Sequence, residues 1–192
     1  SVGIVLVFSL FFKINTVTIV GKSVYKPEKI VEVSGITVGD NLFRVNEDEL
    51  SETLSTRLPY IKSATIKREL PDTLVIEIES TKGVACIENN KTFIIIDSQG
   101  KVLEKAAAEL KEALPVIKNV STKNVEEGSV IELKNAKRNE ALPQLLSAIG
   151  ASGLDSLPEI DLKSVNDIKI KYDNRIILKI GNLTNLEKKL AR

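Results

Sequence analysis

The stretch PYIKSATIKRELPDTLVIEI, residues 59–78, contains the pattern that decides the fold. Apolar residues alternate with polar ones on both sides of its centre, at Ala64, Ile66, Leu70, Leu74, Ile76 and Ile78. A period of two is typical of strands with one buried face. At the centre, Pro71 has the fixed φ that suits the first central position of a β-turn, and an aspartate follows it. The stretch therefore predicts a β-hairpin.

Working upstream, residues 14–20 (INTVTIV) are rich in β-branched side chains and predict a strand. A short helix with Pro27 in its first turn and Gly35 at its end is expected next. A second helix is expected to begin at the N-cap Asn46, and its core stripe comprises Leu50, Leu54 and Leu58. The order strand, helix, helix, strand, strand predicts a small α+β domain whose two helices cover one face of a sheet.

The first residues form an almost continuous apolar run, VGIVLVFSLFF at residues 2–12. It has about half of the roughly 20 apolar residues that a membrane-spanning helix needs. Because the sequence opens with serine and contains no methionine, we interpret the run as the outer half of a membrane helix. Alternatives are the apolar part of a signal peptide or a buried strand or helix. The predicted anchor residues are Val2, Ile4, Val5, Leu6, Val7, Phe8, Leu10, Phe11 and Phe12.

The composition of the 192 residues argues against several classes of function. There is no histidine, so the commonest general base and zinc ligand is missing, and the one cysteine, Cys86, cannot build a disulfide framework. The 27 basic residues balance 26 acidic ones, and aromatic residues are scarce, which disfavours nucleic-acid binding. We expect no enzyme activity, no cofactor, no metal and no small-molecule substrate. The candidate carboxylates Asp97, Asp161 and Asp167 lie at predicted strand ends or turns, where aspartate is common.

The second half of the chain reads as mainly β-structure. Strands are predicted at 84–88 and 91–97, and a final hairpin pairs 168–172 with 176–180. Residues 104–113 have high helix propensity, but their state stays open. The stripe Leu142, Leu145, Leu146 and Ile149 predicts an amphipathic helix with Pro143 near its start and Gly150 at its end. Another helix is expected over 185–192.

The order and spacing of many short matches resemble a POTRA domain of the FtsQ/DivIB type. These matches are Ile14, Val17, Ile19, Gly21, Gly35-Ile36, Gly39, Asn41-Leu42-Phe43, Pro59, Ile61, Ala64, Ile66, Arg68, Leu70-Pro71 and Thr73-Leu74. The Pro-Val-Ala that usually follows the hairpin in this family is replaced by Gly83-Val84-Ala85. The fold class expected is α+β: a POTRA-like β-α-α-β-β domain, then a mainly antiparallel β domain with one or two helices.

The resemblance implies a partial membrane anchor at 1–13, a POTRA-like domain at 14–80 and a β domain at 81–192. It also implies a scaffold of the bacterial cell-division machinery, attached to the cytoplasmic membrane by a single span, with most of the chain outside the cytoplasm at the division site. Expected partners are FtsB/DivIC-like and FtsL-like single-pass division proteins. An alternative is a POTRA-containing component of an outer-membrane assembly or secretion system.

The resemblance also implies that the main partner-binding edge of the β domain is a final strand that follows the last helix. The sequence stops at Arg192, before such a strand, so we expect the segment 175–180 to be left as an open edge and these 192 residues to bind an FtsB/DivIC-like partner weakly or not at all. The expected partner-binding residues are Arg175, Ile177 and Lys179. The alternative is that Ile176, Leu178 and Ile180 fill the core while the charged neighbours are solvated.

Overall fold

The computed structural model describes residues 11–89, 92–107, 114–123, 125–152, 159–172, 176–186 and 189. The chain divides into two compact units, unit 1 (Ser1–Thr81) and unit 2 (Lys82–Arg192). A separate hydrophobic core lies within each unit.

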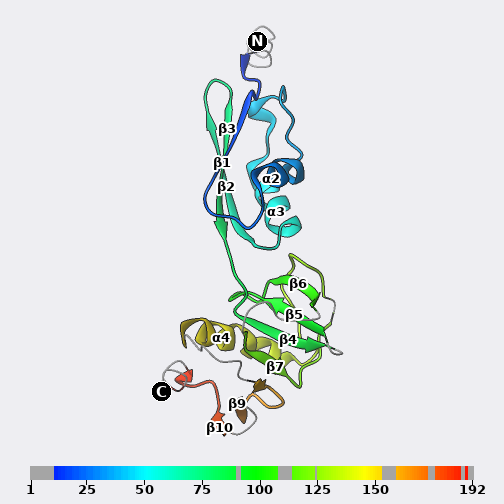
Figure 1. Ribbon diagram of the computed structural model, residues 1–192, viewed down its shortest axis with the longest axis vertical. Coiled ribbons are helices and arrows are strands. Elements are labelled where there is room, and N and C mark those ends of the chain that lie inside the picture. Colours follow the sequence, from blue (N-terminus) through cyan, green and yellow to red (C-terminus); the bar gives the residue numbers. More distant parts are fainter. Residues whose placement is uncertain are drawn as a thin grey trace. The chain divides into compact units, whose positions relative to one another are not determined.

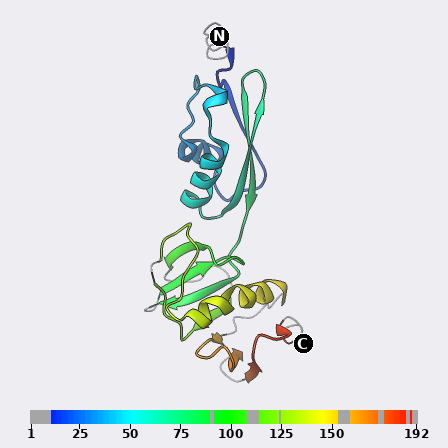
Figure 2. The same ribbon diagram turned by 180° about the vertical axis from the view of Figure 1, so that it is seen from behind.

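Unit 1 has the predicted order of elements: β1 (Thr16–Val20), α2 (Pro27–Ser34), a 3-10 turn η1 (Leu42–Arg44), α3 (Glu47–Arg57), β2 (Ile61–Glu69) and β3 (Thr73–Ser80). The strand order is β1-β3-β2, with β1 parallel and β2 antiparallel to β3. Both helices lie on the same face of this sheet (Figures 1 and 2). The small α+β domain expected from the sequence is confirmed.

Local sequence signals explain where α2 ends and where α3 begins. Gly35 closes α2 in the left-handed conformation with φ of 69°, which glycine adopts without steric cost. The Asn46 side chain caps α3 by accepting a hydrogen bond from the Glu49 backbone N–H at 3.3 Å. The predicted stripe Leu50, Leu54 and Leu58 is buried in the core of unit 1.

The hairpin that decides the fold is formed by β2 and β3, with Ala64 opposite Ile78 and Ile66 opposite Ile76. One expectation is corrected: Leu70 is not on the buried face but 60% exposed, because it lies in the turn beyond the end of β2. Val75 is buried although it points away from the helices. It lies on the central strand, so neighbouring strands flank it on both sides.

Unit 2 contains β4 (Ala85–Asn89), β5 (Thr92–Ile96), β6 (Val102–Ala107), β7 (Val116–Lys118), α4 (Ala136–Ser152), β8 (Glu159–Asp161), β9 (Ile168–Tyr172) and β10 (Ile176–Gly181). Among the described residues these strands form one sheet in the order β10-β9-β8-β7-β4-β5-β6. The pairs β4–β7 and β7–β8 are parallel and the other four are antiparallel, so the mainly antiparallel β domain is confirmed.

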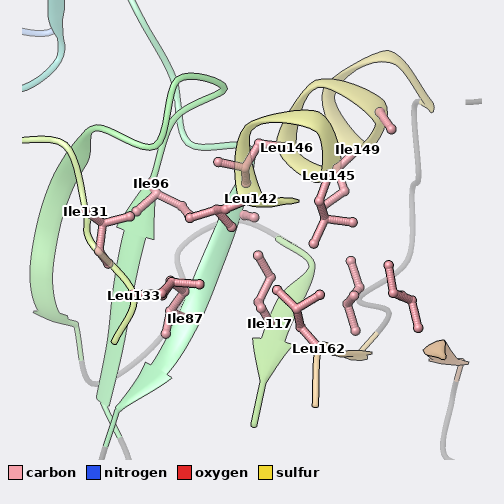
Figure 3. Packing of buried hydrophobic residues seen from close by; sticks show 14 of the residues in the cluster. Ile87, Ile96, Ile117, Ile131, Leu133, Leu142, Leu145, Leu146, Ile149 and Leu162 are labelled. Atoms are coloured by element: carbon pink, nitrogen blue, oxygen red, sulfur yellow. The ribbon is translucent and has the colours of Figure 1, made fainter. Parts of the chain in front are cut away.

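The core of unit 2 lies between α4 and one face of the sheet. Leu142, Leu145 and Leu146 of α4 point toward Ile96 and Ile117 on the strands (Figure 3). Ile131 and Leu133, from the segment before α4, close the core on another side (Figure 3). The predicted amphipathic stripe of this helix is confirmed.

The limits of α4 differ from the expectation. The helix begins at Ala136, so Pro143 lies inside it instead of near its start, and Gly150 lies two residues before its end. Asn135 provides the start signal, since its side chain accepts a hydrogen bond from the Arg138 N–H at 3.1 Å. The apolar stripe begins only at Leu142, which is why the first helical turns were missed.

The structure describes only part of the segment 104–113, whose secondary structure the sequence left open. Residues 104–107 belong to β6, whereas 108–113 lie outside the described residues. The turns at Asn90 and at 173–174 also fall outside them, as does most of the helix expected over 185–192.

Candidate interaction surface

Strand β10 lies at one end of the sheet of unit 2. Its neighbour is β9, with Leu178 opposite Ile170 and Ile177 opposite Lys171. In the described part of the chain no strand pairs with the other side of β10. An edge strand of this kind offers backbone donors and acceptors to an added strand.

The side chains of β10 are unusually apolar for an exposed edge. Ile176, Ile177 and Leu178 are 58%, 60% and 45% exposed, respectively. Cross-strand pairing puts Ile176 and Leu178 on the core-facing side of the sheet and Ile177 on the opposite side. Ile180 alone of the β10 isoleucines packs against the core of unit 2. The strand therefore presents apolar surface on both faces, as well as along its edge.

The far end of β10 is closed by its own chain. The pairing with β9 is irregular between Lys179 and Gly181, and Gly181 has φ of 75°. The Lys189 ammonium donates hydrogen bonds to the backbone oxygens of Ile180 at 3.0 Å and Asn182 at 3.1 Å. These contacts occupy carbonyl groups that an added strand could otherwise use. The part of β10 left open is thus Ile176 to Lys179.

Charged residues lie on the same sheet face as Ile177, on strands further from the edge. The Lys118 ammonium, on β7, lies 2.7 Å from the Glu159 carboxylate and 3.2 Å from that of Glu88, so it bridges the strands on both sides. The hydrogen bond to Glu159, reinforced by Glu88, outweighs burial and raises the pKa of Lys118. This ladder fixes β7 between β4 and β8 on the solvent side.

Asp161 extends this charged face toward β9. Burial alone would raise the pKa of Asp161, but hydrogen bonds from Asn119 and the Lys163 N–H, with the charge of Lys169, hold it below its usual range. Lys169 itself lies 3.1 Å from Asp167. The face beside β10 therefore carries ionised groups that are already paired.

The structure places part of the sequence-predicted set. Ile177 and Lys179 lie on the same face of β10, two residues apart, while Arg175 falls outside the described residues. Of the predicted anchor residues, Val2 to Leu10 fall outside them as well. Phe11 is exposed, and Phe12 packs against the core of unit 1.

Sequence reasoning missed Ile176 and Leu178 as candidate contact residues. It treated them as possible core residues, whereas both are exposed and neither packs against the core of unit 2 as far as that unit is described. A signal was available: three consecutive aliphatic residues break the alternation that a strand with one buried face would show.

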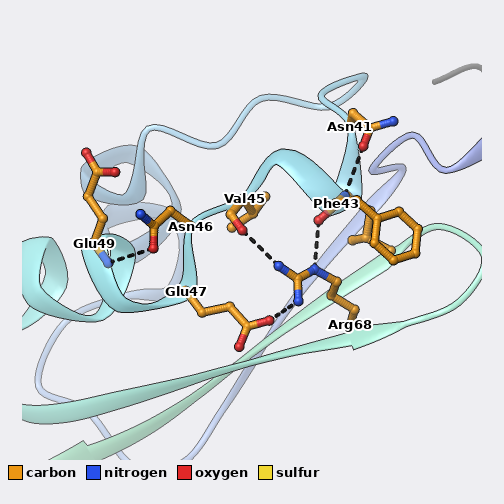
Figure 4. Close-up of polar contacts among 8 residues, drawn as sticks. Asn41, Phe43, Val45, Asn46, Glu47, Glu49 and Arg68 are labelled. Atoms are coloured by element: carbon orange, nitrogen blue, oxygen red, sulfur yellow. Dashed lines mark hydrogen bonds and ion pairs between the residues drawn. The ribbon is translucent and has the colours of Figure 1, made fainter. Parts of the chain in front are cut away.

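Arg68 lies at the centre of a polar cluster in unit 1 (Figure 4). Its guanidinium donates to the backbone oxygens of Leu42 at 2.9 Å and Val45 at 2.8 Å and pairs with Glu47. It also lies 6.0 Å from the centre of the Phe43 ring. All of these partners belong to the turn η1 and the start of α3, so Arg68 holds that turn against β2.

The candidate carboxylate Asp97 stabilises the loop in which it lies. Asp97 accepts hydrogen bonds from the backbone N–H groups of Gln99 and Lys101, both at 2.9 Å, in the turn between β5 and β6.

Burial raises the pKa of Cys86 to about 12, so its thiol stays protonated. Within the described ranges, no group of three or more acidic or cysteine side chains is placed to hold a metal ion. Nor does this part of the chain contain a helix of the length and apolarity required to cross a membrane.

Comparison with known proteins covers both units. Residues 12–79 match the family model described as POTRA domain, FtsQ-type. Residues 85–192 match the model described as cell division protein FtsQ/DivIB, C-terminal, which spans more than half of the chain. The chain belongs to the FtsQ/DivIB family of cell division proteins.

Individual relatives agree with this family. The chain is 30% identical over 183 residues to cell division protein DivIB of Clostridium tetani, covering 95% of this chain and 68% of the relative. It is 24% identical over 190 residues to DivIB of Clostridium acetobutylicum, covering 94% and 71%. It is 28% identical over 149 residues to cell division protein FtsQ of Corynebacterium glutamicum, covering 78% and 60%. The resemblance to the FtsQ/DivIB family is confirmed.

Proposed function

We propose that this FtsQ/DivIB-family chain is a non-enzymatic scaffold of the division machinery that binds other single-pass division proteins through the open edge of β10. The observation that carries this proposal is the exposed apolar run Ile176 to Leu178 on a strand that, among the described residues, is paired on one side only. A partner segment added beside β10 would gain main-chain hydrogen bonds and would cover side chains that are otherwise in water.

The partners proposed are FtsB/DivIC-like and FtsL-like proteins, and the site of action is the outer face of the cytoplasmic membrane at the division septum. The apolar run at residues 2–12 supports a single membrane anchor. The match to the FtsQ/DivIB C-terminal model favours this function over a role in outer-membrane assembly or secretion. A tagged full-length protein should therefore accumulate at midcell, and a uniform signal along the envelope would contradict the proposal.

Titration of a labelled FtsB/DivIC-like peptide against the 192-residue chain tests the binding edge. Ile177→Asp should weaken binding by roughly tenfold, because it puts a charge into a contact that must lose water. Val130→Asp is the matched control, since Val130 is equally exposed in the same unit but lies outside the strands of the sheet. Equal affinities for the wild type and Ile177→Asp, with both proteins folded, would overturn the assignment of the edge.

A further inference from the structure

One end of unit 1 collects exposed apolar side chains. Among the ten exposed large hydrophobic residues in the described part of the chain, four lie on three segments that meet at this end. Phe11 opens the described chain, Val38 and Phe43 come from the loop before α3, and Leu70 comes from the hairpin turn. We refer to these four residues as the apolar tip. Figures 1 and 2 both show the hairpin turn and the loop before α3 at the end where the chain enters unit 1.

Hydrogen bonds tie these three segments together. The Phe12 oxygen accepts from the Leu42 N–H at 2.8 Å, and the Ile14 oxygen accepts from the Gly39 N–H at 2.8 Å. The Asn15 N–H donates to the Asp72 oxygen in the hairpin turn at 2.9 Å. The segments that carry the apolar tip are therefore held together by backbone hydrogen bonds, and the chain is part of this arrangement from Phe12 onward.

Aromatic packing strengthens the same junction. The rings of Phe12 and Phe43 meet edge to face with centres 5.1 Å apart. Phe11 and Phe12 are also the last two residues of the apolar run that begins at Val2. The same short segment thus belongs both to the proposed anchor and to the folded unit.

This continuity identifies what covers the tip. If residues 2–12 lie in the membrane, as the proposed function requires, Phe11 lies at the boundary between hydrocarbon and water, and its neighbours in the tip lie at that boundary too. Phenylalanine and leucine side chains lose unfavourable contact with water there. Charges near the tip are of both signs: Lys13, Asp40 and Arg44 line one pocket, and Asp72 in the hairpin turn accepts a hydrogen bond from Asn15. The proposed contact therefore does not depend on anionic lipid.

We propose that the apolar tip inserts into the interfacial region of the lipid bilayer, so that unit 1 rests on the membrane surface. This inference rests on the proposed membrane anchor. It goes further, because an anchor alone would allow unit 1 to stand away from the lipid.

A single tryptophan tests the contact, since the 192 residues contain none. The full-length protein carrying Phe43→Trp is reconstituted in phosphatidylcholine vesicles with brominated acyl chains, and emission from the unsubstituted protein is subtracted. We expect loss of tryptophan emission relative to unbrominated vesicles, and Leu70→Trp should give the same result. The matched control is Val24→Trp, which is 68% exposed in the same unit but lies beyond the other end of β1. A strand of five residues separates the two ends by about 17 Å, so this control should keep its emission.

Flotation of the same vesicles separates the two claims. If the protein floats with the vesicles and both tip reporters are quenched while Val24→Trp is not, the proposal is supported. If it floats but the tip reporters keep their emission, or Val24→Trp is quenched equally, the tip contact is wrong and the anchor stands. If the protein does not float, the anchor is wrong and the tip contact falls with it.

Discussion

Arg68 shows how one side chain holds a loop that the sequence alone does not explain. It lies on β2, and its partners lie 21 to 26 residues earlier in the chain, at Leu42, Val45 and Glu47. The planar guanidinium reaches all three because its N–H groups diverge in a fixed fork. The role of Arg68 is therefore to stabilise unit 1.

Arg68→Lys should lower the free energy of unfolding of unit 1 by about 1–3 kcal/mol, because a lysine keeps the charge but cannot satisfy the two backbone carbonyls together. Chemical denaturation followed by circular dichroism would measure it. Lys67→Arg is the control: Lys67 pairs with Glu77 on the exposed face, so the change should stay within about 0.5 kcal/mol. Equal effects of the two substitutions would contradict this role for Arg68.

Two glycines of unit 1 should respond differently to alanine. A Cβ at Gly21 would collide with the backbone oxygen of Ile78, and φ is 110° there. A Cβ at Gly35 would meet open space at φ of 69°. We expect Gly35→Ala to cost about 1 kcal/mol and Gly21→Ala at least about 2 kcal/mol in unfolding free energy. Denaturant midpoints for the two variants check this, and a smaller effect at Gly21 would be inconsistent with the structure.

For single residues, features that depend on sequence neighbours could be predicted from the sequence, whereas contacts between residues far apart in the chain could not. The cap at Asn46 and the stop at Gly35 depend on neighbours within one helical turn, and both were predicted. Leu70 was misplaced because the pattern continues into the turn, where no strand buries it. The contacts of Arg68 depend on how β2 packs against the turn η1 in the folded unit, and no periodic pattern in the sequence predicts that packing.

Among the elements, β7 is a short strand held on both sides by one lysine. The contacts of Lys118 with Glu159 and Glu88 connect it to β8 and β4. Because folding raises the pKa of Lys118, its contribution to stability is fully present below the unfolded-state pKa and is lost as pH rises through the folded-state pKa.

Lys118→Arg should keep that contribution in alkaline solution, since arginine stays charged there. We expect the unfolding free energy of the wild type to fall relative to that of Lys118→Arg as pH rises above about 10. Urea denaturation at a series of pH values measures the difference, and the other lysines cancel because both proteins share them. If the difference in unfolding free energy between the two proteins stayed constant over this pH range, the proposed stabilising role of the Lys118 ion pairs would be wrong.

Element types were easier to predict than element limits. The two strands of the final hairpin, 168–172 and 176–180, were predicted, and Leu178 lies opposite Ile170 as that pairing implies. The start of α4 was missed because its first turns carry no apolar stripe. Residues 104–107 joined a strand despite high helix propensity, since pairing of β6 with β5 outweighs a weak local preference.

For the whole molecule, the division into units at Thr81 and Lys82 gives each half its own core. We propose that the two units unfold separately. Gly21→Ala should then lower the denaturant midpoint of one transition and leave the other, belonging to unit 2, unchanged. Residue-resolved hydrogen exchange would assign each transition, and a single cooperative transition shifted as a whole by Gly21→Ala would contradict independence.

The family could be recognised from the sequence because short motifs keep their order along unit 1, as the match to the FtsQ-type POTRA model at residues 12–79 bears out. The interaction surface could be located less fully. Ile177 and Lys179 were chosen from the position of the last hairpin, but the exposure of Ile176 and Leu178 depends on how far the core of unit 2 extends under the sheet. That extent is a property of packing across the whole unit.

Backbone hydrogen exchange of β10 with and without an FtsB/DivIC-like peptide tests the central claim most directly. Strand addition should slow exchange of outward-facing amides between Ile176 and Lys179, because each would gain a hydrogen bond to the added strand. Exchange in unit 1 should not change. A peptide that binds with no added protection in β10, or that protects amides elsewhere instead, would show that the open edge is not the binding site.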